Sequence, residues 1–121
     1  MTANVDLKKL LGLIGSIELK SEDTSSAQVL IASTSEKSVR VTWANLVKEV
    51  YFDFVQGQGD RHSDWVDFYD GESSEEIGDY ILCIVSRFFG SQTRLHTIPG
   101  ALPITVVQYA HGSEWRGLLQ A

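Results

Sequence analysis

The chain has 121 residues, of which 43% are hydrophobic and 10% aromatic, and it carries a formal net charge of −6. Its length is typical of one domain and its composition of a globular protein, so we expect a single domain over residues 1–121. The negative charge argues against direct binding to nucleic acid or to an anionic membrane. Cys83 is the only cysteine, so an intrachain disulfide is impossible and a cytoplasmic location is expected.

The beginning of the chain predicts a helix and a polar loop. Over residues 5–17 apolar side chains recur at near-helical spacing, and Asn4 or Asp6 can cap the helix start. This apolar run is too short to span a membrane and lacks a signal-peptide cleavage site, so we interpret it as an amphipathic helix. Residues 20–27 are polar and are expected to form a loop.

Two strands are expected next. Residues 28–32 form a short apolar segment, and residues 39–43 alternate between apolar and polar side chains, with a polar turn over 33–38 between them. Residues 43–50 fit either a short helix or a strand, because their apolar positions match helical spacing while β-rich sequence lies on both sides.

The middle of the chain predicts a β-hairpin. The segments 51–55 and 64–69 are rich in aromatic and β-branched residues, and they flank a loop over 56–63 that contains Gly57 and Gly59. Such a pair of strands is expected to be antiparallel, although this loop is longer than most hairpin loops.

A helix over residues 74–89 is the clearest element of the sequence. Ser73 and Glu76 have the spacing of a capping box, in which each side chain accepts a hydrogen bond from the other residue's backbone N–H. Gly90 is suited to end the helix. Because a wide apolar stripe follows the cap, we expect this helix to pack centrally, with Cys83 as a small buried hydrophobic residue.

The C-terminal part predicts a loop, a strand and a short helix. Pro99 and Pro103 mark the loop, residues 104–109 are β-rich, and Ser113 can cap a helix that ends near Leu119. The order of elements predicts an α+β fold. We expect an antiparallel or mixed sheet of about four to five strands, a central packed helix and shorter terminal helices.

The acidic residues are unevenly distributed along the chain. Residues 49–79 contain ten of the 16 acids and one base, Arg61, which gives this segment a net charge of −9. The other ninety residues carry six acids and nine bases, a net charge of +3. Acids near the start of the 74–89 helix favour its dipole, but this does not explain the acids of the hairpin.

One face of the predicted hairpin combines acids with aromatic rings. Strand alternation directs Val50, Phe52 and Phe54 to one side and the acids and remaining rings to the other. Rings supply rigid contact area, and carboxylates steer a basic protein toward the face. The expected partner-binding residues are Glu49, Tyr51, Asp53, Trp65, Asp67, Tyr69, Asp70 and Glu72. The alternative is that another element covers this face or that it is only solvated.

No catalytic or metal-binding motif stands out in the sequence. The segment 60–64 has alternating polar residues without the spacing of a calcium loop, and His96 and His111 lack the cysteine or histidine neighbours of a zinc site. Nucleophile elbows, phosphate loops and dinucleotide fingerprints are absent from the sequence. We therefore expect no enzymatic activity, no metal and no cofactor.

In its small size, acidity, lack of motifs and acidic–aromatic face, the chain resembles the immunity proteins of interbacterial toxin systems, in particular those of contact-dependent growth inhibition. The resemblance implies a stoichiometric inhibitor that binds a cognate basic toxin domain, often a nuclease. We expect a monomer or a weak dimer. The alternatives are a nucleic-acid mimic that inhibits a defence nuclease, a small enzyme with a concave pocket, and a structural or oligomer-forming subunit.

Overall fold

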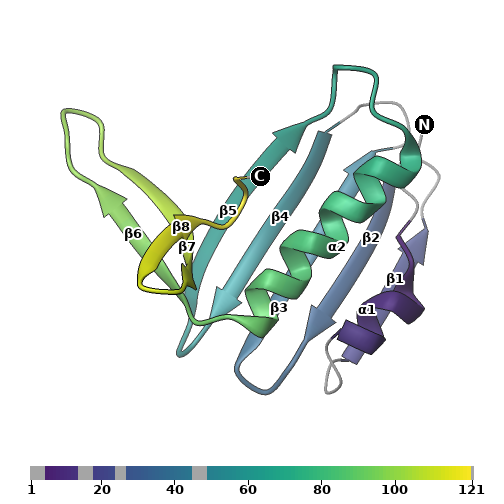
Figure 1. Ribbon diagram of the computed structural model, residues 1–121, viewed down its shortest axis with the longest axis horizontal. Coiled ribbons are helices and arrows are strands. Elements are labelled where there is room, and N and C mark those ends of the chain that lie inside the picture. Colours follow the sequence, from purple (N-terminus) through teal and green to yellow (C-terminus); the bar gives the residue numbers. More distant parts are fainter. Residues whose placement is uncertain (1–4, 14–17, 24–26, 45–48, 121) are drawn as a thin grey trace.

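The structure, a computed structural model, describes residues 5–13, 18–23, 27–44 and 49–120. Within these ranges the chain forms two helices and eight strands (Figure 1). In chain order they are α1 (Leu7–Leu13), β1 (Glu18–Asp23), β2 (Ala27–Ser33), β3 (Lys37–Ala44), β4 (Glu49–Gln56), β5 (Asp60–Asp67), α2 (Ser74–Gly90), β6 (Thr93–Ile98), β7 (Ile104–His111) and β8 (Glu114–Gly117).

The strands form two antiparallel sheets. The first has five strands in the order β1-β2-β3-β4-β5, and the second has three in the order β6-β7-β8. Within each sheet, therefore, every strand pairs with its neighbours along the chain. The expected α+β class and central helix are confirmed, whereas the expected number of four to five strands is too low, because a second, smaller sheet follows α2.

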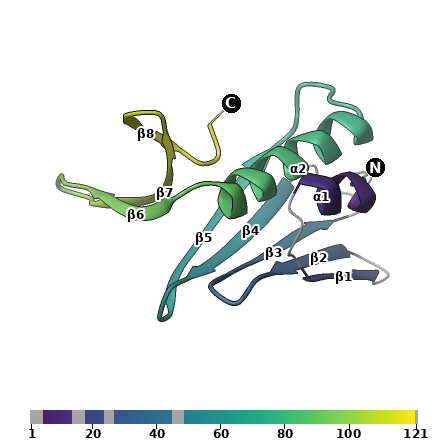
Figure 2. The ribbon, with the colours of Figure 1, turned by 60° about the horizontal axis from the view of Figure 1, so that its bottom comes forward.

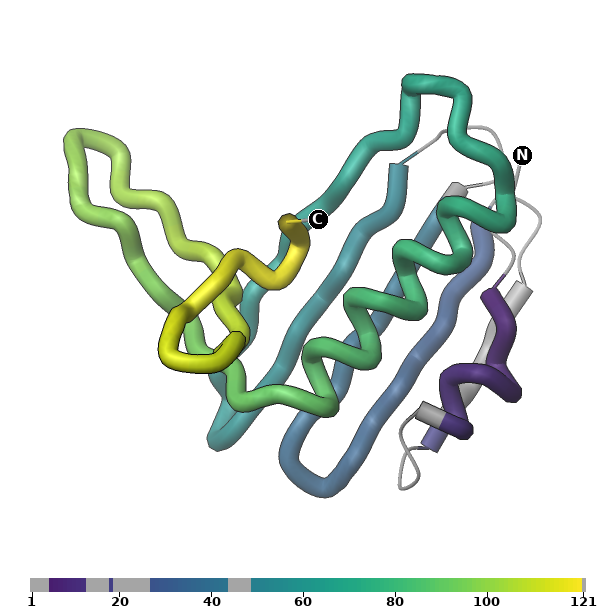
Figure 3. The backbone as a smooth tube through the Cα atoms, viewed as in Figure 1, coloured from purple at the N-terminus to yellow at the C-terminus, as the bar shows by residue number. Residues whose placement is uncertain are grey.

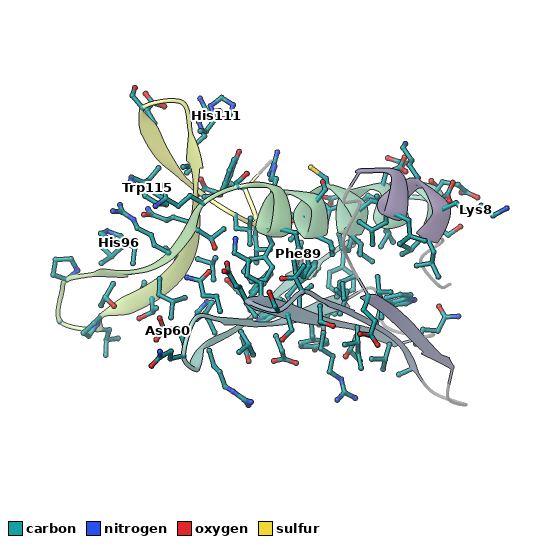
Figure 4. The ribbon with its side chains drawn as sticks, turned by 90° about the horizontal axis from the view of Figure 1, so that it is seen from below. Lys8, Asp60, Phe89, His96, His111 and Trp115 are labelled. Carbon is teal, nitrogen blue, oxygen red and sulfur yellow. The ribbon has the colours of Figure 1, made fainter. Side chains whose placement is uncertain are left out.

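Both helices lie over the same face of the five-stranded sheet, and the second sheet lies beyond β5 (Figure 2). Alternate residues of β2, β3 and β4 point toward α2 and form the core with its buried side. The largest fully buried side chains are Phe52, Phe88, Leu10, Leu30, Ile81, Ile84, Leu118, Val39, Val41, Val50 and Val85. No element of the described ranges covers the other face of the five-stranded sheet (Figure 4). Neither described helix is long and apolar enough to cross a membrane.

The start of α1 matches one of the two expected caps. The Asp6 carboxylate accepts a hydrogen bond from the Lys9 backbone N–H at 3.1 Å, which is the bond of an N-cap residue. The helix begins at Leu7, later than expected from the apolar spacing. Asn4 and residues 14–17 lie outside the described residues.

The start of α2 is the predicted capping box. The Ser73 hydroxyl accepts a hydrogen bond from the Glu76 N–H at 3.1 Å, and the Glu76 carboxylate accepts one from the Ser73 N–H at 3.2 Å. The end of the helix differs from the expectation. Gly90 is the last helical residue, and Ser91 follows it in an extended conformation.

Lys37 of β3 fastens the end of α2 to the sheet. Its ammonium donates hydrogen bonds to the carbonyl oxygens of Phe88 and Ser91 at 2.6 and 2.8 Å, and it lies 5.1 Å from the centroid of the Phe88 ring. Burial lowers the pKa of Lys37, and the nearby Glu36 carboxylate opposes this shift. The cation compensates carbonyl groups that have no partner within the helix.

We expect Ser73→Ala to lower the free energy of unfolding by about 1 kcal/mol, because the Glu76 N–H loses its acceptor. Ser74→Ala is the matched control, since the Ser74 hydroxyl donates to the neighbouring Glu75 carboxylate. Denaturant unfolding of the two variants measures the difference. Equal losses would contradict the assignment of Ser73 as the cap.

Two expected loops differ in the structure. Residues 20–23 belong to β1 and Ala27 begins β2, so the loop expected over 20–27 is wrong for these residues, and residues 24–26 lie outside the described residues. Strand β1 could not be predicted from its polar composition, because an edge strand can pair through its backbone without alternating apolar side chains. The loop expected over 56–63 is a turn of three residues that ends where β5 begins. Gly57 and Gly59 adopt φ values of 61° and 104°, which permit this tight turn.

Three further expectations change in the structure. Residues 114–117 form β8, which pairs with the end of β7, and not a helix capped by Ser113. Cys83 is exposed rather than buried, because α2 turns only one side toward the sheet. The ambiguous segment 43–50 begins in β3 and ends in β4. Its residues 45–48 lie outside the described residues.

The C-terminal segment ties the second sheet to α2. The Arg87 guanidinium donates a hydrogen bond to the Gln120 carbonyl oxygen at 2.7 Å and lies 5.0 Å from the centroid of the Tyr109 ring. The Tyr80 hydroxyl donates to the Leu119 carbonyl oxygen at 2.6 Å. Burial raises the pKa of Tyr80 to about 12.

Tyr80→Phe is expected to flatten the alkaline pH dependence of stability. The folded-state pKa of about 12 exceeds the ordinary value of 10.0, so the stability from the neutral hydroxyl is complete below pH ~10 and is lost as the pH rises toward ~12. Wild type should therefore lose stability faster than the variant across this window, as measured by denaturant unfolding. Parallel pH profiles would contradict a role for the Tyr80 hydroxyl.

Candidate protein-binding face

The outward face of β4 and β5 carries the residues expected to bind a partner. The pairs opposite each other across the two strands are Glu49 and Asp67, Tyr51 and Trp65, and Asp53 and Ser63. Val50, Phe52 and Phe54 point inward and belong to the core. The inward and outward sides of β4 are therefore those that the alternation predicts, and the outward side lies on the uncovered face of the sheet (Figure 4).

Three aromatic side chains are exposed together at this face. The exposed fractions are 43% for Tyr51, 53% for Trp65 and 61% for Tyr69. The rings of Tyr51 and Trp65 are tilted relative to each other, and their centroids are 6.5 Å apart. Large adjacent rings of this kind supply rigid apolar area with a polar edge, as is common at the centres of protein interfaces.

Glu49 connects two of these rings. One of its carboxylate oxygens accepts a hydrogen bond from the Tyr51 hydroxyl, and the other accepts one from the Tyr69 hydroxyl at 2.9 Å. These bonds lower the pKa of Glu49 and raise the pKa of both tyrosines. The carboxylate therefore stays charged and orients both rings at once.

Glu49 also faces a second acid. Asp67 stands directly opposite it on β5, and like charges in such a pair destabilise a sheet. Among the described residues, the ion pairs within 4 Å are those of His62 with Asp64 and of Arg116 with Glu114, so neither Glu49 nor Asp67 is neutralised by a base at that distance. Within the described residues, the Glu49 carboxylate accepts hydrogen bonds only from the two tyrosine hydroxyls, and no hydrogen bond or ion pair is seen for the Asp67 carboxylate.

The face is less acidic toward the β4–β5 turn. Asp53 accepts a hydrogen bond from the Ser63 hydroxyl and stands opposite Arg40 of β3. Arg61 is exposed near the start of β5 and pairs with Val55. Both bases lie near Asp53 in the strand register, although no ion pair within 4 Å joins them to it among the described residues. The end of the face that holds Glu49 and Asp67 has no base in the corresponding register positions of β4 and β5.

Asp70 and Glu72 lie beyond the strand, in the connection to α2. The Asp70 N–H donates to the Glu72 carboxylate at 3.1 Å, and Gly71 between them has a φ of 83°. In the described part of the chain, no hydrogen bond joins these two acids to the exposed rings. The structure thus brings five of the eight expected residues together in what we call the aromatic–acid cluster, which consists of Glu49, Tyr51, Trp65, Asp67 and Tyr69.

Sequence reasoning missed Arg40 and Ser63 as members of this face. The alternation of residues 39–43 already predicts that Arg40 points to the opposite face of the sheet from the buried Val39 and Val41. Which acid lies beside Arg40 depends on the register between β3 and β4, and the sequence contains no local signal for that register.

Among the clefts that the described residues line elsewhere on the molecule, two are the largest. A cleft of about 740 Å³ opens beside Lys37, whose ammonium is occupied by carbonyl oxygens at the end of α2. A second cleft, of about 410 Å³, lies between β5 and the second sheet and is lined in part by Asp64 and Arg116. The Asp64 carboxylate accepts a hydrogen bond from the Trp65 N–H, and Arg116 lies 3.6 Å from Glu114. These charged groups already have partners, so the clefts are weaker candidates than the aromatic–acid cluster.

The polar segment 60–64 is spread along β5, where successive side chains point to opposite faces. His62 Nε2 is buried without a hydrogen-bond partner and lies 3.7 Å from Asp64 Oδ2. Within the described ranges, no three histidine, cysteine or acidic side chains converge as metal ligands would.

Comparisons with protein-family models, with curated proteins and with solved structures each gave no match. The geometry and charge of the exposed face are therefore the features of this chain that bear on its function.

Proposed function

We propose that this protein is a stoichiometric inhibitor, an immunity protein, that binds a basic toxin domain through the aromatic–acid cluster. The observation that carries the proposal is the exposure of Tyr51, Trp65 and Tyr69 beside two opposed carboxylates on an uncovered sheet face (Figure 4). Contiguous exposed aromatic surface rimmed by polar groups is typical of protein-binding sites.

The chemistry of the cluster suits arginine or lysine side chains of a partner. A guanidinium can lie over the Trp65 ring and pair with the Asp67 carboxylate, which combines a cation–π contact with charge-assisted hydrogen bonds. Such a cation also reduces the repulsion between Asp67 and Glu49. Binding of a basic partner thereby relieves an unfavourable contact that the free protein retains.

A nuclease is the proposed class of toxin. Its substrate groove is basic because it must hold a polyanion, and the opposed carboxylates of Glu49 and Asp67 are attracted to such a groove. One inhibitor seated in the groove excludes the nucleic acid. The proposed location is the cytoplasm, where the nucleic acid is found and where a single cysteine stays reduced.

The test combines capture with growth protection. Immobilised wild-type protein should retain one basic protein in a one-to-one complex. That protein, expressed alone, should arrest growth, and co-expression of wild type should restore it. The double variant Trp65→Ala/Asp67→Lys should lose both capture and protection. Asp79→Lys is the matched control, because it reverses an exposed acid on α2 and should keep both.

Two results would overturn the proposal. Full growth protection by the double variant would show that the aromatic–acid cluster is not the site. Retention of many unrelated basic proteins, all displaced by a polyanion, would assign the chain to the nucleic-acid mimics instead.

A further inference from the structure

The second sheet extends into a projecting hairpin, here called the β6–β7 arm. It consists of β6, the connection 99–103 and residues 104–107 at the start of β7. In the tube view the arm runs away from α2 and from the five-stranded sheet (Figure 3). Figure 4 shows His96 on this arm, away from the core beneath α2.

Both edges of the arm are open along the backbone. The strand order β6-β7-β8 puts β6 at an edge of its sheet. On the other side, β8 pairs only with residues 108–111 of β7, and the Val107 carbonyl oxygen accepts a hydrogen bond from the Leu118 N–H at 2.8 Å, so residues 104–106 have a backbone neighbour on one side alone. Near the base of β6 the Thr93 carbonyl oxygen accepts a hydrogen bond from the Gln56 amide. The open edge of β6 therefore runs from Arg94 to Ile98, with His96 at its midpoint.

Beyond Arg94 near its base, the arm lacks the charges that usually protect open strand edges. Residues 95–113 contain no aspartate, glutamate, lysine or arginine. The other edge strands β1, β5 and β8 each carry two or more charged residues in their sequences, whereas β6 carries one, Arg94. Near the tip, Ile98, Leu102 and Ile104 are exposed to 48%, 86% and 59%. An exposed, uncharged edge rich in β-branched residues is a template for pairing with another strand.

We propose that the β6–β7 arm is a dimerisation element, in which β6 pairs antiparallel with β6 of a second copy, with His96 opposite His96. This register places Arg94 of each copy opposite Ile98 of the other, so the two guanidinium groups stay apart. Arg94 is already held within its own chain by a hydrogen bond to Gln108 and by the Trp115 ring, 4.2 Å from its guanidinium carbon.

Charge selects a second copy as the occupant of this edge. The uncharged residues of this edge have no electrostatic attraction for a basic protein. When they pair with the same residues of a second copy, no charged side chain has to be desolvated. Contact through the arms keeps the acids at the start of α2 apart, because this end of α2 lies at the far end of the molecule from the arm (Figure 1). An acid closer to the arm is on β5, where Asp64 lines a cleft together with Ile98 and Val106. Two-fold pairing of identical strands is self-complementary and closed.

The experiment uses the pure full chain and no partner, so its outcome is independent of the proposed inhibitor function. Sedimentation velocity over a concentration series should show wild type passing from one chain to two. His96→Glu and His96→Lys each place like charges at the symmetry axis and should weaken the dimer by about tenfold or more. An equimolar mixture of the two variants should form a heterodimer at least as stable as the wild-type dimer, which also shows that both variants fold.

His111→Glu is the matched control, because His111 is an exposed histidine at the other end of β7, outside the arm. It should dimerise like wild type. The proposal fails if wild type stays a single chain at every concentration, or if the mixed His96 variants remain single chains while wild type dimerises. Wild type that stays a single chain but binds neutral lipid vesicles would also overturn it and would assign the apolar tip to a lipid surface.

Discussion

Phe88→Ala is expected to lower the free energy of unfolding by about 3–5 kcal/mol, the usual loss for a fully buried ring. Phe88 is 0% exposed. Its ring centroid lies 4.9 Å from that of Phe54 and 5.2 Å from that of Phe89, and the Lys37 ammonium lies over the ring. The substitution therefore opens a cavity at the place where α2, β3 and β4 meet, and it removes the cation–π contact of Lys37.

Cys83→Ala is the matched control for this prediction, because Cys83 lies on the exposed side of the same helix. We expect it to change the free energy of unfolding by less than about 0.5 kcal/mol. Denaturant unfolding of both variants measures the difference. Similar small losses in the two would mean that α2 does not pack on the sheet through Phe88.

Trp65→Ala is expected to weaken binding of the proposed basic partner by about 2 kcal/mol or more, which is about 30-fold in Kd. The ring is 53% exposed in the free protein and adjoins Tyr51, so the folded state loses little when it is removed. The loss should fall mainly on the dissociation rate, because a buried anchor acts after the encounter. Binding kinetics of the purified pair by surface plasmon resonance separate the two rates.

Asp67→Lys tests the charge of the same cluster in a different way. It should slow association by roughly tenfold or more at low salt, since steering by opposed charges is lost, and the effect should shrink at high salt. The variant should be as stable as wild type or more so, because the introduced ammonium would face Glu49 and replace a repulsive pair by an attractive one.

Asp79→Lys makes the same change of charge on α2 and should leave both rates close to those of wild type. Lost binding together with retained or increased stability is the signature of a functional acid rather than a structural one. Unchanged, salt-insensitive association by Asp67→Lys would place the binding site elsewhere on the protein.

Features that depend on residues close together in the chain were predictable. The capping box of α2 needs only Ser73 and Glu76 at the right spacing, and both hydrogen bonds are present. The alternation of β4 directs Phe52 and Phe54 into the core and leaves Tyr51 outside, as expected. A period of two along a strand determines the side of each residue as soon as one face is buried.

Features that depend on pairing partners were not predictable. Residues 20–23 have the composition of a loop and become β1 only because β2 lies beside them. Residues 114–117 follow a possible helix cap, Ser113, but they form β8 because they pair with the end of β7. In both segments the backbone hydrogen bonds to a neighbouring strand outweigh weak local preferences.

The candidate site also has features that the local sequence predicts and features that depend on strand pairing. The sequence by itself determined that acids and rings alternate with core residues over 49–55, and that charge is concentrated in 49–79. Only the tertiary structure decided that Glu49 faces Asp67 and accepts hydrogen bonds from two tyrosine hydroxyls, that Arg40 stands opposite Asp53, and that no described element covers the face. Periodicity and charge are local properties of a chain, whereas register and exposure arise from contacts between strands whose pairing the local sequence does not encode.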